Sequence, residues 1–239
     1  MLPPASIPET LFDAYTLHEQ IPVEQHYLND TCISPIKYTK NEVDFFLGKA
    51  ARREANYYGI TDLWFYDALE DFSEHFLNQE VAIIGSTVPW YESIVLHFGG
   101  KPFTIDYNPI TVEDSRLSAI TVAEYQRNPR QFDVVVSISS YEHDGLGRYG
   151  DLLDPNGDLK AMEECKRMLK PNGILILAVP VGPDLLVWNA HRIYGKLRLP
   201  MLLNGWRIIK SYGFDPLDFL EYQVDHHQPI FVLTKNLSQ

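Results

Sequence analysis

Ionisable and hydroxyl side chains gather directly after one apolar run of the chain. The run Phe132–Ile138 has the pattern of a buried strand, and the polar cluster Ser139–Asp144 follows it without a break. In open α/β sheets, ligands bind outside the carboxyl ends of the strands. Within the cluster, His143 has an unperturbed pKa of roughly 6.5, which suits a general base, and Glu142 stands beside it. The cluster therefore predicts a functional site.

A loop with three glycines, residues 145–151, follows this cluster. Its Arg148 is placed to clamp an acidic group and its Tyr149 to stack on a ring of the substrate. The alternative is a glycine-rich turn with a surface arginine. Two roles stay open for three side chains further along, the lining of an acceptor pocket or the packing face of a lid: Trp188, His191 and Tyr194.

A second ligand site is predicted where another apolar run ends in a glycine. Val81–Gly85 and the helical pattern after it have the form of a β-α-β unit whose first strand is buried on both faces. Gly85 lets the backbone pass close to a ligand, and the next helix offers free N–H groups. The second strand ends in Asp106, which is placed to accept hydrogen bonds from ribose hydroxyls. The unit therefore suggests an adenosine-type ligand.

A parallel sheet is needed to position these sites. The apolar runs predict five successive strands, at residues 80–85, 102–106, 118–122, 132–138 and 174–179. Two more strands are expected at 218–224 and 230–234, joined as a hairpin that makes the last strand antiparallel. The alternation of strands with helical patterns predicts an α/β fold with a mostly parallel sheet covered on both faces.

The chain is expected to have two parts. Residues 1–78 would form an N-terminal arm and helices packed on the core, and residues 79–239 the sheet domain. The first 40 residues are rich in proline and aromatic residues, so they predict an ordered arm. This arm covers either the site or only apolar surface.

The remaining elements carry local signals. The Ser/Thr-x-x-Glu pattern of Thr39–Glu42 predicts a capping box and a helix from 42 to 57, and Asp62 is expected to cap the next helix. Residues 183–199 indicate an inserted hairpin or lid. Residues 200–212 are expected to form a helix.

Composition limits the partners. The 239 residues are 45% hydrophobic, which is enough for a full core, and the net charge of −12 argues against nucleic acid and anionic membranes. The longest apolar run, Ile174–Val181, is far shorter than the roughly 18 residues that a membrane span needs. Cys32 and Cys165 are too few for a disulfide framework, so we expect reduced cysteines and a cytoplasmic setting.

Over residues 80–235, the pattern resembles the class I S-adenosylmethionine-dependent methyltransferases. The resemblance rests on these stretches: Val81–Gly85, Thr104–Asp106, Phe132–Ser137, Glu142-His143 and Leu169–Leu177. The last stretch is similar to the leucine-lysine-proline-glycine-glycine turn before the fifth strand of many such enzymes. Gly147–Asp151 and Ala178–Gly182 look like a domain-of-unknown-function family grouped with them. The resemblance implies a Rossmann-like fold and S-adenosylmethionine as cofactor.

The resemblance also implies cofactor-binding residues. Gly85 matches the first glycine of the loop after strand one, and Asp106 matches the ribose-binding acid. Glu124 is the match, in a loose alignment, for the polar residue that contacts adenine. The set of cofactor-binding candidates also includes Ser86, Thr87, Glu92, Tyr107 and Ser137.

The glycine loop departs from the family pattern. The second and third glycines are Thr87 and Pro89 here, and the acid normally two residues before the first glycine is Ile83. Proline removes a donor and fixes φ. The hydroxyls of Ser86 and Thr87 and the helix N-terminus are expected to compensate.

By the same resemblance, Glu142 and His143 are the candidate catalytic residues. His143 is the expected base for an oxygen or nitrogen nucleophile, although the pair is structural in some members of the fold. Some relatives hold a divalent ion with a Glu-x-x-Glu-His cluster, but Ser139 replaces the first glutamate here. A metal site would need Asp144, Asp151 or His191 in its place, and we predict none.

Three functions remain open at this point. The leading one is an S-adenosylmethionine-dependent methyltransferase acting on a small or saccharide-like acceptor, with no nucleic-acid or membrane partner and an open oligomeric state. The second is a non-catalytic binding or scaffold protein with a degenerate cofactor loop. The third is an enzyme that uses the same pocket for a different nucleotide.

Overall fold

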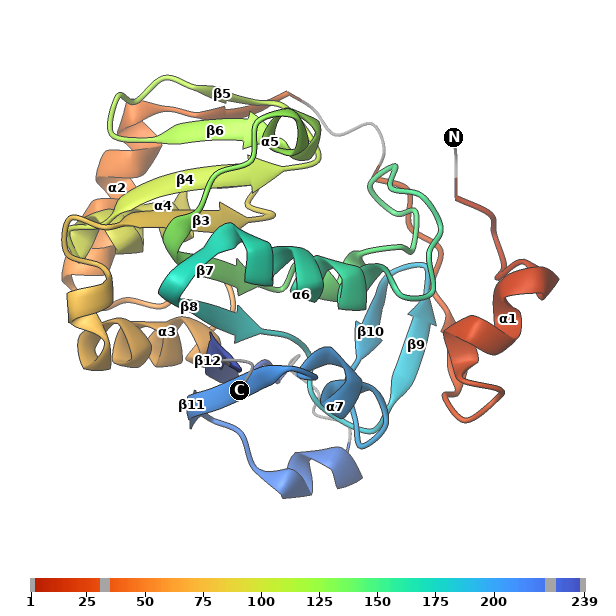
Figure 1. Ribbon diagram of the computed structural model, residues 1–239. Helices are drawn as coiled ribbons and strands as arrows, with labels where there is room; N and C mark the ends of the chain where they lie inside the picture. Colours follow the sequence, from red (N-terminus) through yellow and green to blue (C-terminus); the bar gives the residue numbers. More distant parts are fainter. Residues whose placement is uncertain (1–2, 31–34, 222–226, 237–239) are drawn as a thin grey trace.

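A seven-stranded sheet forms the centre of the computed structural model, which describes residues 3–30, 35–221 and 227–236 (Figure 1). The strands lie in the order β11-β12-β8-β7-β3-β4-β6. Their bounds are β3 Glu80–Ile84, β4 Lys101–Asp106, β6 Ser118–Thr121, β7 Phe132–Ile138, β8 Leu169–Ala178, β11 Trp206–Tyr212 and β12 Ile230–Lys235. β12 is antiparallel to both of its neighbours, and the other pairs are parallel. The predicted α/β fold is confirmed.

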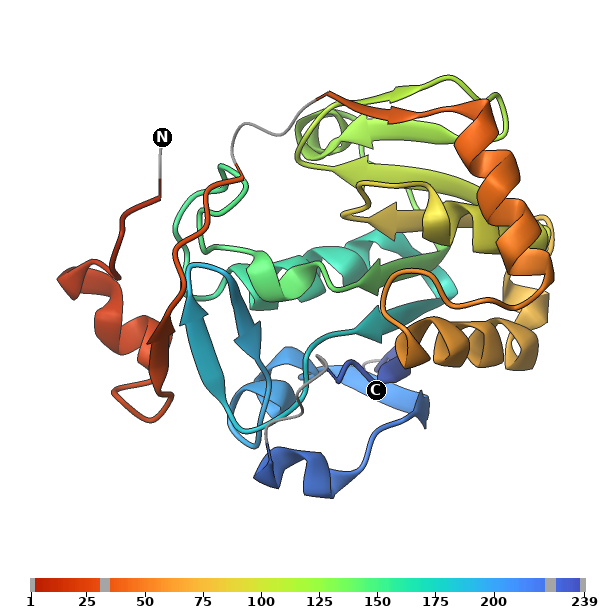
Figure 2. The same cartoon turned by 180° about the vertical axis from the view of Figure 1, so that it is seen from behind.

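Helices cover both faces of this sheet, so its central strands are apolar on both sides (Figures 1 and 2). In β3, Val81 and Ile83 join the core on one face, whereas Ala82 joins the core on the other. The helices are α2 Lys40–Ala51, α3 Ile60–Asp71 and α4 Trp90–His97 on the first side, and α5 Val122–Arg127, α6 Gly157–Met168 and α7 Arg198–Leu202 on the second. No helix among the described residues is long and apolar enough to cross a bilayer.

The two N-terminal helices begin differently from each other. The capping box of α2 forms as predicted, with the Glu42 carboxylate accepting the Thr39 backbone N–H at 3.1 Å. The helix ends at Ala51, earlier than expected. The prediction that Asp62 caps α3 is wrong, because Gly59 holds the N-cap position and Asp62 lies in the first turn. There it accepts backbone N–H groups of the preceding loop instead.

The N-terminal arm and the predicted hairpin form a second sheet beside the main one (Figures 1 and 2). Strand β1 pairs in parallel with β9, and β9 pairs antiparallel with β10, so the hairpin expected within residues 183–199 is confirmed. A short parallel pair, β2 and β5, lies elsewhere. The bounds are α1 Glu9–Thr16, β1 Val23–Gln25, β2 Ile36–Tyr38, β5 Ile110–Val112, β9 Leu185–Trp188 and β10 His191–Ile193.

The C-terminal part contradicts two expectations. The helix expected over residues 200–212 is wrong, because only the short α7 forms and the edge strand β11 follows it. Gly205, with φ of 74°, turns the chain between them, and pairing with β12 overrides the helical spacing. Instead of a strand from residue 218, residues 216–220 form a 3₁₀ turn, and 222–224 lie outside the described residues. The strand that pairs antiparallel with β12 on the side away from β8 is therefore β11 and not a strand at 218–224.

Candidate active site

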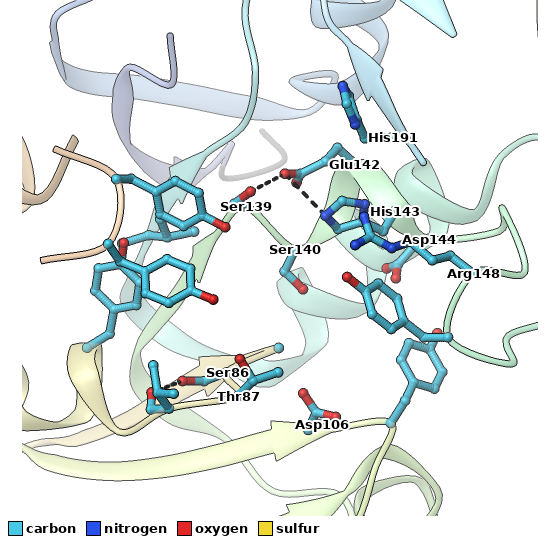
Figure 3. Close-up of a pocket in the computed structure, with 18 of the residues that line it drawn as sticks. Ser86, Thr87, Asp106, Ser139, Ser140, Glu142, His143, Asp144, Arg148 and His191 are labelled. Atoms are coloured by element: carbon cyan, nitrogen blue, oxygen red, sulfur yellow. Dashed lines mark hydrogen bonds and ion pairs between the residues drawn. The ribbon is translucent and has the colours of Figure 1, made fainter. Parts of the chain in front are cut away.

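Two cavities open at the carboxyl edge of the parallel strands, and Figure 3 shows residues that line the first of them. The first has a volume of about 310 Å³ and the second about 530 Å³. The loops after β3, β4 and β7 supply the residues that border both: Gly85, Asp106, Tyr107, Ser140 and Asp144. The two sites that the sequence suggested separately therefore meet at one place.

Gly85 makes the closest contact between two of these loops. Its φ is 67°, and a Cβ atom at this position would lie 2.3 Å from the Ser140 Oγ atom. A side chain here would therefore collide with the loop after β7 as well as strain the backbone. The absence of a side chain keeps the loop after β3 directly against Ser140, and Ser86 and Thr87 follow it along the first cavity.

Glu92, a cofactor-binding candidate, lies outside both cavities. Its buried carboxylate accepts hydrogen bonds from the hydroxyls of Thr104 at 2.7 Å, Tyr38 at 3.2 Å and Ser86 at 3.1 Å. Burial raises the pKa of Glu92 to about 7. Glu92 therefore stabilises the loop after β3 from the protein interior, through its hydrogen bond with Ser86.

Asp106 ends β4, as predicted, and borders both cavities. Its side chain is only 7% exposed, and its Oδ1 atom accepts the Asn108 backbone N–H at 2.7 Å. Burial raises the pKa of this carboxyl group. Tyr107 follows with a half-exposed ring at the same border. A buried acid with one occupied oxygen is available to accept hydrogen bonds from a ligand.

Part of the wall of the second cavity is apolar, with Ile105, Val122, Tyr125 and Leu152, and several charged side chains also line it. The apolar part suits a planar ring system. Glu124 lies beside them in the sequence but does not line the cavity, because its carboxylate closes the capping box of α5 with Thr121. Glu124, which the loose alignment offered as an adenine contact, is therefore a helix-capping residue in this structure.

Glu142 carries an unsatisfied oxygen beside the first cavity. The Ser139 hydroxyl donates to Glu142 Oε1 at 2.6 Å, and Gln228 Nε2 donates to Ser139 Oγ at 3.1 Å. The other carboxylate oxygen of Glu142, Oε2, and the amide oxygen of Gln228, Oε1, are buried and have no partner among the described residues. Burial raises the pKa of Glu142 to about 7. Buried polar atoms without partners are rare in proteins, so these two oxygens point to a ligand.

His143 is held in one tautomer. Its Nδ1 lies 2.6 Å from the Ala190 carbonyl oxygen, which only accepts, so Nδ1 carries the proton and Nε2 is the acceptor. Nε2 lies 3.7 Å from Glu142 Oε1 (Figure 3). Burial lowers the pKa of His143 to about 3. The ring is therefore neutral near pH 7, which makes it a weaker base than its unperturbed pKa suggests.

The three predicted substrate residues all line the first cavity (Figure 3). The Arg148 Nε donates to Asp30 of the N-terminal arm at 2.7 Å, and its guanidinium lies 4.9 Å from the centre of the Tyr149 ring. His191 comes from β10, and its ring centre is 6.3 Å from that of His143. The arm thus reaches the site through a residue that the sequence interpretation did not select.

Aromatic residues from the loop before α3 and from the start of α4 form a wall of the first cavity that sequence reasoning missed: Tyr57, Tyr58, Trp90 and Tyr91. The Asp62 carboxylate positions this wall, because it accepts the backbone N–H groups of Tyr57 and Tyr58 and the hydroxyl of Tyr91. Gln228 was also missed. No local pattern in these segments shows that they meet β7.

Ser137, another cofactor-binding candidate, is buried inside β7 and lines neither cavity. Its hydroxyl finds no partner in the described part of the chain. A metal cluster was the other open question at this strand end. Within residues 3–30, 35–221 and 227–236, no group of three or more His, Cys, Asp or Glu side chains is arranged to hold an ion.

Comparisons with known proteins agree on the fold. The sequence matches no curated protein. A family model described as "Caenorhabditis protein of unknown function, DUF268" matches residues 78–233, which include both cavities' strands.

Among solved structures, 1,6-didemethyltoxoflavin-N1-methyltransferase from Burkholderia thailandensis, with bound S-adenosylhomocysteine, is similar over 90% of this chain and 100% of its own, with a TM-score of 0.52 and 14% identity. The CcbJ methyltransferase from Streptomyces caelestis covers 72% of this chain and 89% of its own, at a TM-score of 0.46 and 9% identity. A putative hemolysin from Streptococcus thermophilus covers 77% of this chain and 69% of its own, at a TM-score of 0.48 and 15% identity. The first of these supports a Rossmann-like methyltransferase fold.

Proposed function

We propose that this chain, which belongs to the DUF268 family of proteins of unknown function, is an S-adenosylmethionine-dependent methyltransferase that acts on a small acceptor. The observation that carries the proposal is the meeting of two cavities at Gly85 and Asp106, where the first cavity also brings Glu142 and His143 together. This arrangement lies at the carboxyl edge of a parallel sheet, where such folds bind ligands.

The residues present fit the cofactor. Asp106 would hold the ribose hydroxyls, and the apolar part of the second cavity's wall would enclose the adenine. Trp90 Nε1 is a buried donor without a partner among the described residues, and Trp90 lines the first cavity at the start of α4. This donor and the first N–H groups of α4 suit the carboxylate of the cofactor's amino-acid part.

The cofactor would supply a methyl group activated by a sulfonium, so positioning of the acceptor accounts for much of the rate. Burial raises the pKa of Glu142 to about 7, so its carboxylate is able to accept a proton from the acceptor near neutral pH. His143 is neutral and offers Nε2 as a hydrogen-bond acceptor. We therefore assign the base to Glu142 and a positioning role to His143.

The altered glycine loop supports a second candidate, a non-catalytic protein that uses the fold for binding. Pro89 occupies the N-cap position of α4, makes no side-chain hydrogen bond there and lacks an N–H. The buried, unpartnered oxygen of Glu142 argues against this candidate, because a scaffold gains nothing from the cost of leaving it unpaired.

Calorimetric titration with S-adenosylmethionine and S-adenosylhomocysteine separates the two candidates. We expect micromolar binding by the wild type and a loss of at least about tenfold in affinity for Asp106→Ala, because charged hydrogen bonds to the ribose are removed. Asp71→Ala is the control, since Asp71 is exposed and pairs with Lys210 on the sheet edge. No binding by folded, ligand-free wild type would favour the scaffold, and unchanged affinity in Asp106→Ala would remove the ribose assignment.

A further inference from the structure

We propose that the acceptor is an amine, held in the first cavity as an ammonium group by Glu142, Gln228 and His143. The inference deepens the proposed function and depends on it for methyl transfer, but the amine site itself is testable without the cofactor. The sequence suggested a small or saccharide-like acceptor, and an amino sugar or another small amine satisfies both statements.

Three open hydrogen-bonding atoms at the strand end are acceptors. Ser139 Oγ links the two residues that carry them, because it lies 2.6 Å from Glu142 Oε1 and 3.1 Å from Gln228 Nε2. Their other atoms, Glu142 Oε2 and Gln228 Oε1, are buried without partners in the described chain. His143 adds Nε2, an acceptor in the tautomer that Ala190 fixes, 3.7 Å from Glu142 Oε1. A ligand that fills this place must bring hydrogen-bond donors.

Three side chains that line the cavity already direct a donor at a protein acceptor. The Ser139 hydroxyl donates to Glu142, the Tyr91 hydroxyl donates to Asp62, and Arg148 donates to Asp30. An ammonium group has three donors and no acceptor, whereas a hydroxyl also brings lone pairs that need donors. Trp90 Nε1 is an unpartnered donor of the same cavity, and it lies at the start of α4, which we assign to the cofactor's carboxylate.

The rest of the wall favours a cation as well. Five tyrosines line the first cavity, together with Trp90: Tyr57, Tyr58, Tyr91, Tyr107 and Tyr149. Aromatic faces attract an ammonium group through the ring quadrupole. The cavity therefore combines a carboxyl group with aromatic surface, which is the combination that amines require.

An ammonium nitrogen has no lone pair until one proton leaves. In the proposed site that N–H bond breaks, a new O–H bond forms at Glu142 Oε2, and the electron pair stays on nitrogen. The pKa of Glu142, raised to about 7 by burial, makes this carboxylate a better proton acceptor than an exposed glutamate. The unpartnered oxygen and the proton acceptor are then the same atom.

Benzylammonium and benzyl alcohol form a matched pair of probes, because they share a ring and differ in the group under test. Binding is followed by tryptophan fluorescence on the full chain without cofactor, at equal ionic strength. We expect the wild type to bind benzylammonium at least about tenfold more tightly than benzyl alcohol. Equal binding of the two, tighter binding of the alcohol, or no binding of the amine at concentrations up to about 50 mM, where even a small fragment binds a real site, would overturn the proposal.

Glu142→Gln tests the assignment, since the amide keeps the size of the side chain but loses the charge. We expect the preference for the amine to fall to about threefold or less, and Gln228→Ala to weaken amine binding as a second variant. Asp71→Asn is the control, because it also removes a carboxylate but Asp71 is exposed, pairs with Lys210 and lies outside the cavity. A preference that survives in both cavity variants, with folding verified by circular dichroism, would refute the site. Loss of S-adenosylmethionine binding alone would refute the methyltransferase and leave the amine site standing.

Discussion

Two buried glutamates of this chain have similar pKa values and opposite surroundings. Three hydroxyls satisfy Glu92 behind the loop after β3, whereas Glu142 leaves one oxygen open beside the first cavity. Burial raises the pKa of both to about 7. The pKa values of these two glutamates therefore do not separate the structural residue from the candidate functional one. The hydrogen-bond partners of their carboxylate oxygens do.

Glu92→Gln should change how stability depends on pH. The folded pKa of Glu92 is raised from 4.5 to about 7, so its contribution to stability is present below pH 4.5 and is lost as pH rises through 7. The free energy of unfolding of the variant, taken relative to the wild type, should rise by roughly 2 kcal/mol when the pH is raised from about 5 to about 8. The variant lacks the hydrogen bonds of the Glu92 carboxyl group at both pH values. Urea unfolding at the two pH values measures this, and an identical stability difference at both would show that Glu92 is ionised normally.

At the scale of elements, one carboxylate connects α3 to the cavity wall. Asp62 accepts the backbone N–H groups of residues 56, 57 and 58 and the Tyr91 hydroxyl, and it is fully buried. The loop before α3 and the start of α4 are therefore fixed by the same side chain. Tyr57 and Tyr58 depend on it for their place in the wall.

Asp62→Ala should lower the free energy of unfolding by at least about 3 kcal/mol, because the buried Tyr91 hydroxyl and three part-buried backbone N–H groups lose their acceptor. Asp67→Ala, on the same helix, should cost less than about 1 kcal/mol, since Asp67 pairs with Arg53 at the surface. Denaturant unfolding of both variants measures the difference. Equal losses would mean that the loop holds its conformation without Asp62.

Elements with strong local patterns were predictable from the sequence. β3 and β7 follow largely apolar runs, and the capping box of α2 fixes its start. β11 was not predictable, because Leu202, Trp206 and Ile209 have helical spacing and only the pairing with β12 decides the structure. Short strands such as β2 and β5 also exist only through each other.

The site was predictable in part for the same reason. Glu142, His143 and Asp106 follow strands directly, so the rule that ligands bind at strand ends found them. Gln228 and the tyrosines before α3 come from distant segments, and no spacing in the sequence brings them to β7. The lowered pKa of His143 and the raised pKa of Glu142 depend on burial, which only the folded chain provides.

At the scale of the whole molecule, the N-terminal arm supports the site from outside the main sheet. Tyr15 packs edge-on against Trp188, with Leu146 and Leu186 in the same apolar cluster, and Asp30 pairs with Arg148. No residue of the arm that the structure describes lines the second cavity.

Removal of residues 1–30 should therefore separate stability from cofactor binding. We expect the thermal midpoint to fall by about 5 °C or more, because Trp188 and its neighbours lose their cover. The affinity for S-adenosylmethionine should change by less than about threefold, which corresponds to a binding free energy difference below about 1 kcal/mol. Scanning calorimetry and titration of the truncated chain measure both. A complete loss of cofactor binding would show that the arm belongs to the cofactor site.

The position of β12 has a consequence for synthesis. β12 lies between β8 and β11, although it follows both of them in the chain. While the chain leaves the ribosome, β8 and β11 each carry an unpaired edge until residues 230–235 emerge. β11 has no other partner strand in the described structure, so nascent chains stalled before that point would leave its backbone N–H and C=O groups unpaired and recruit chaperones.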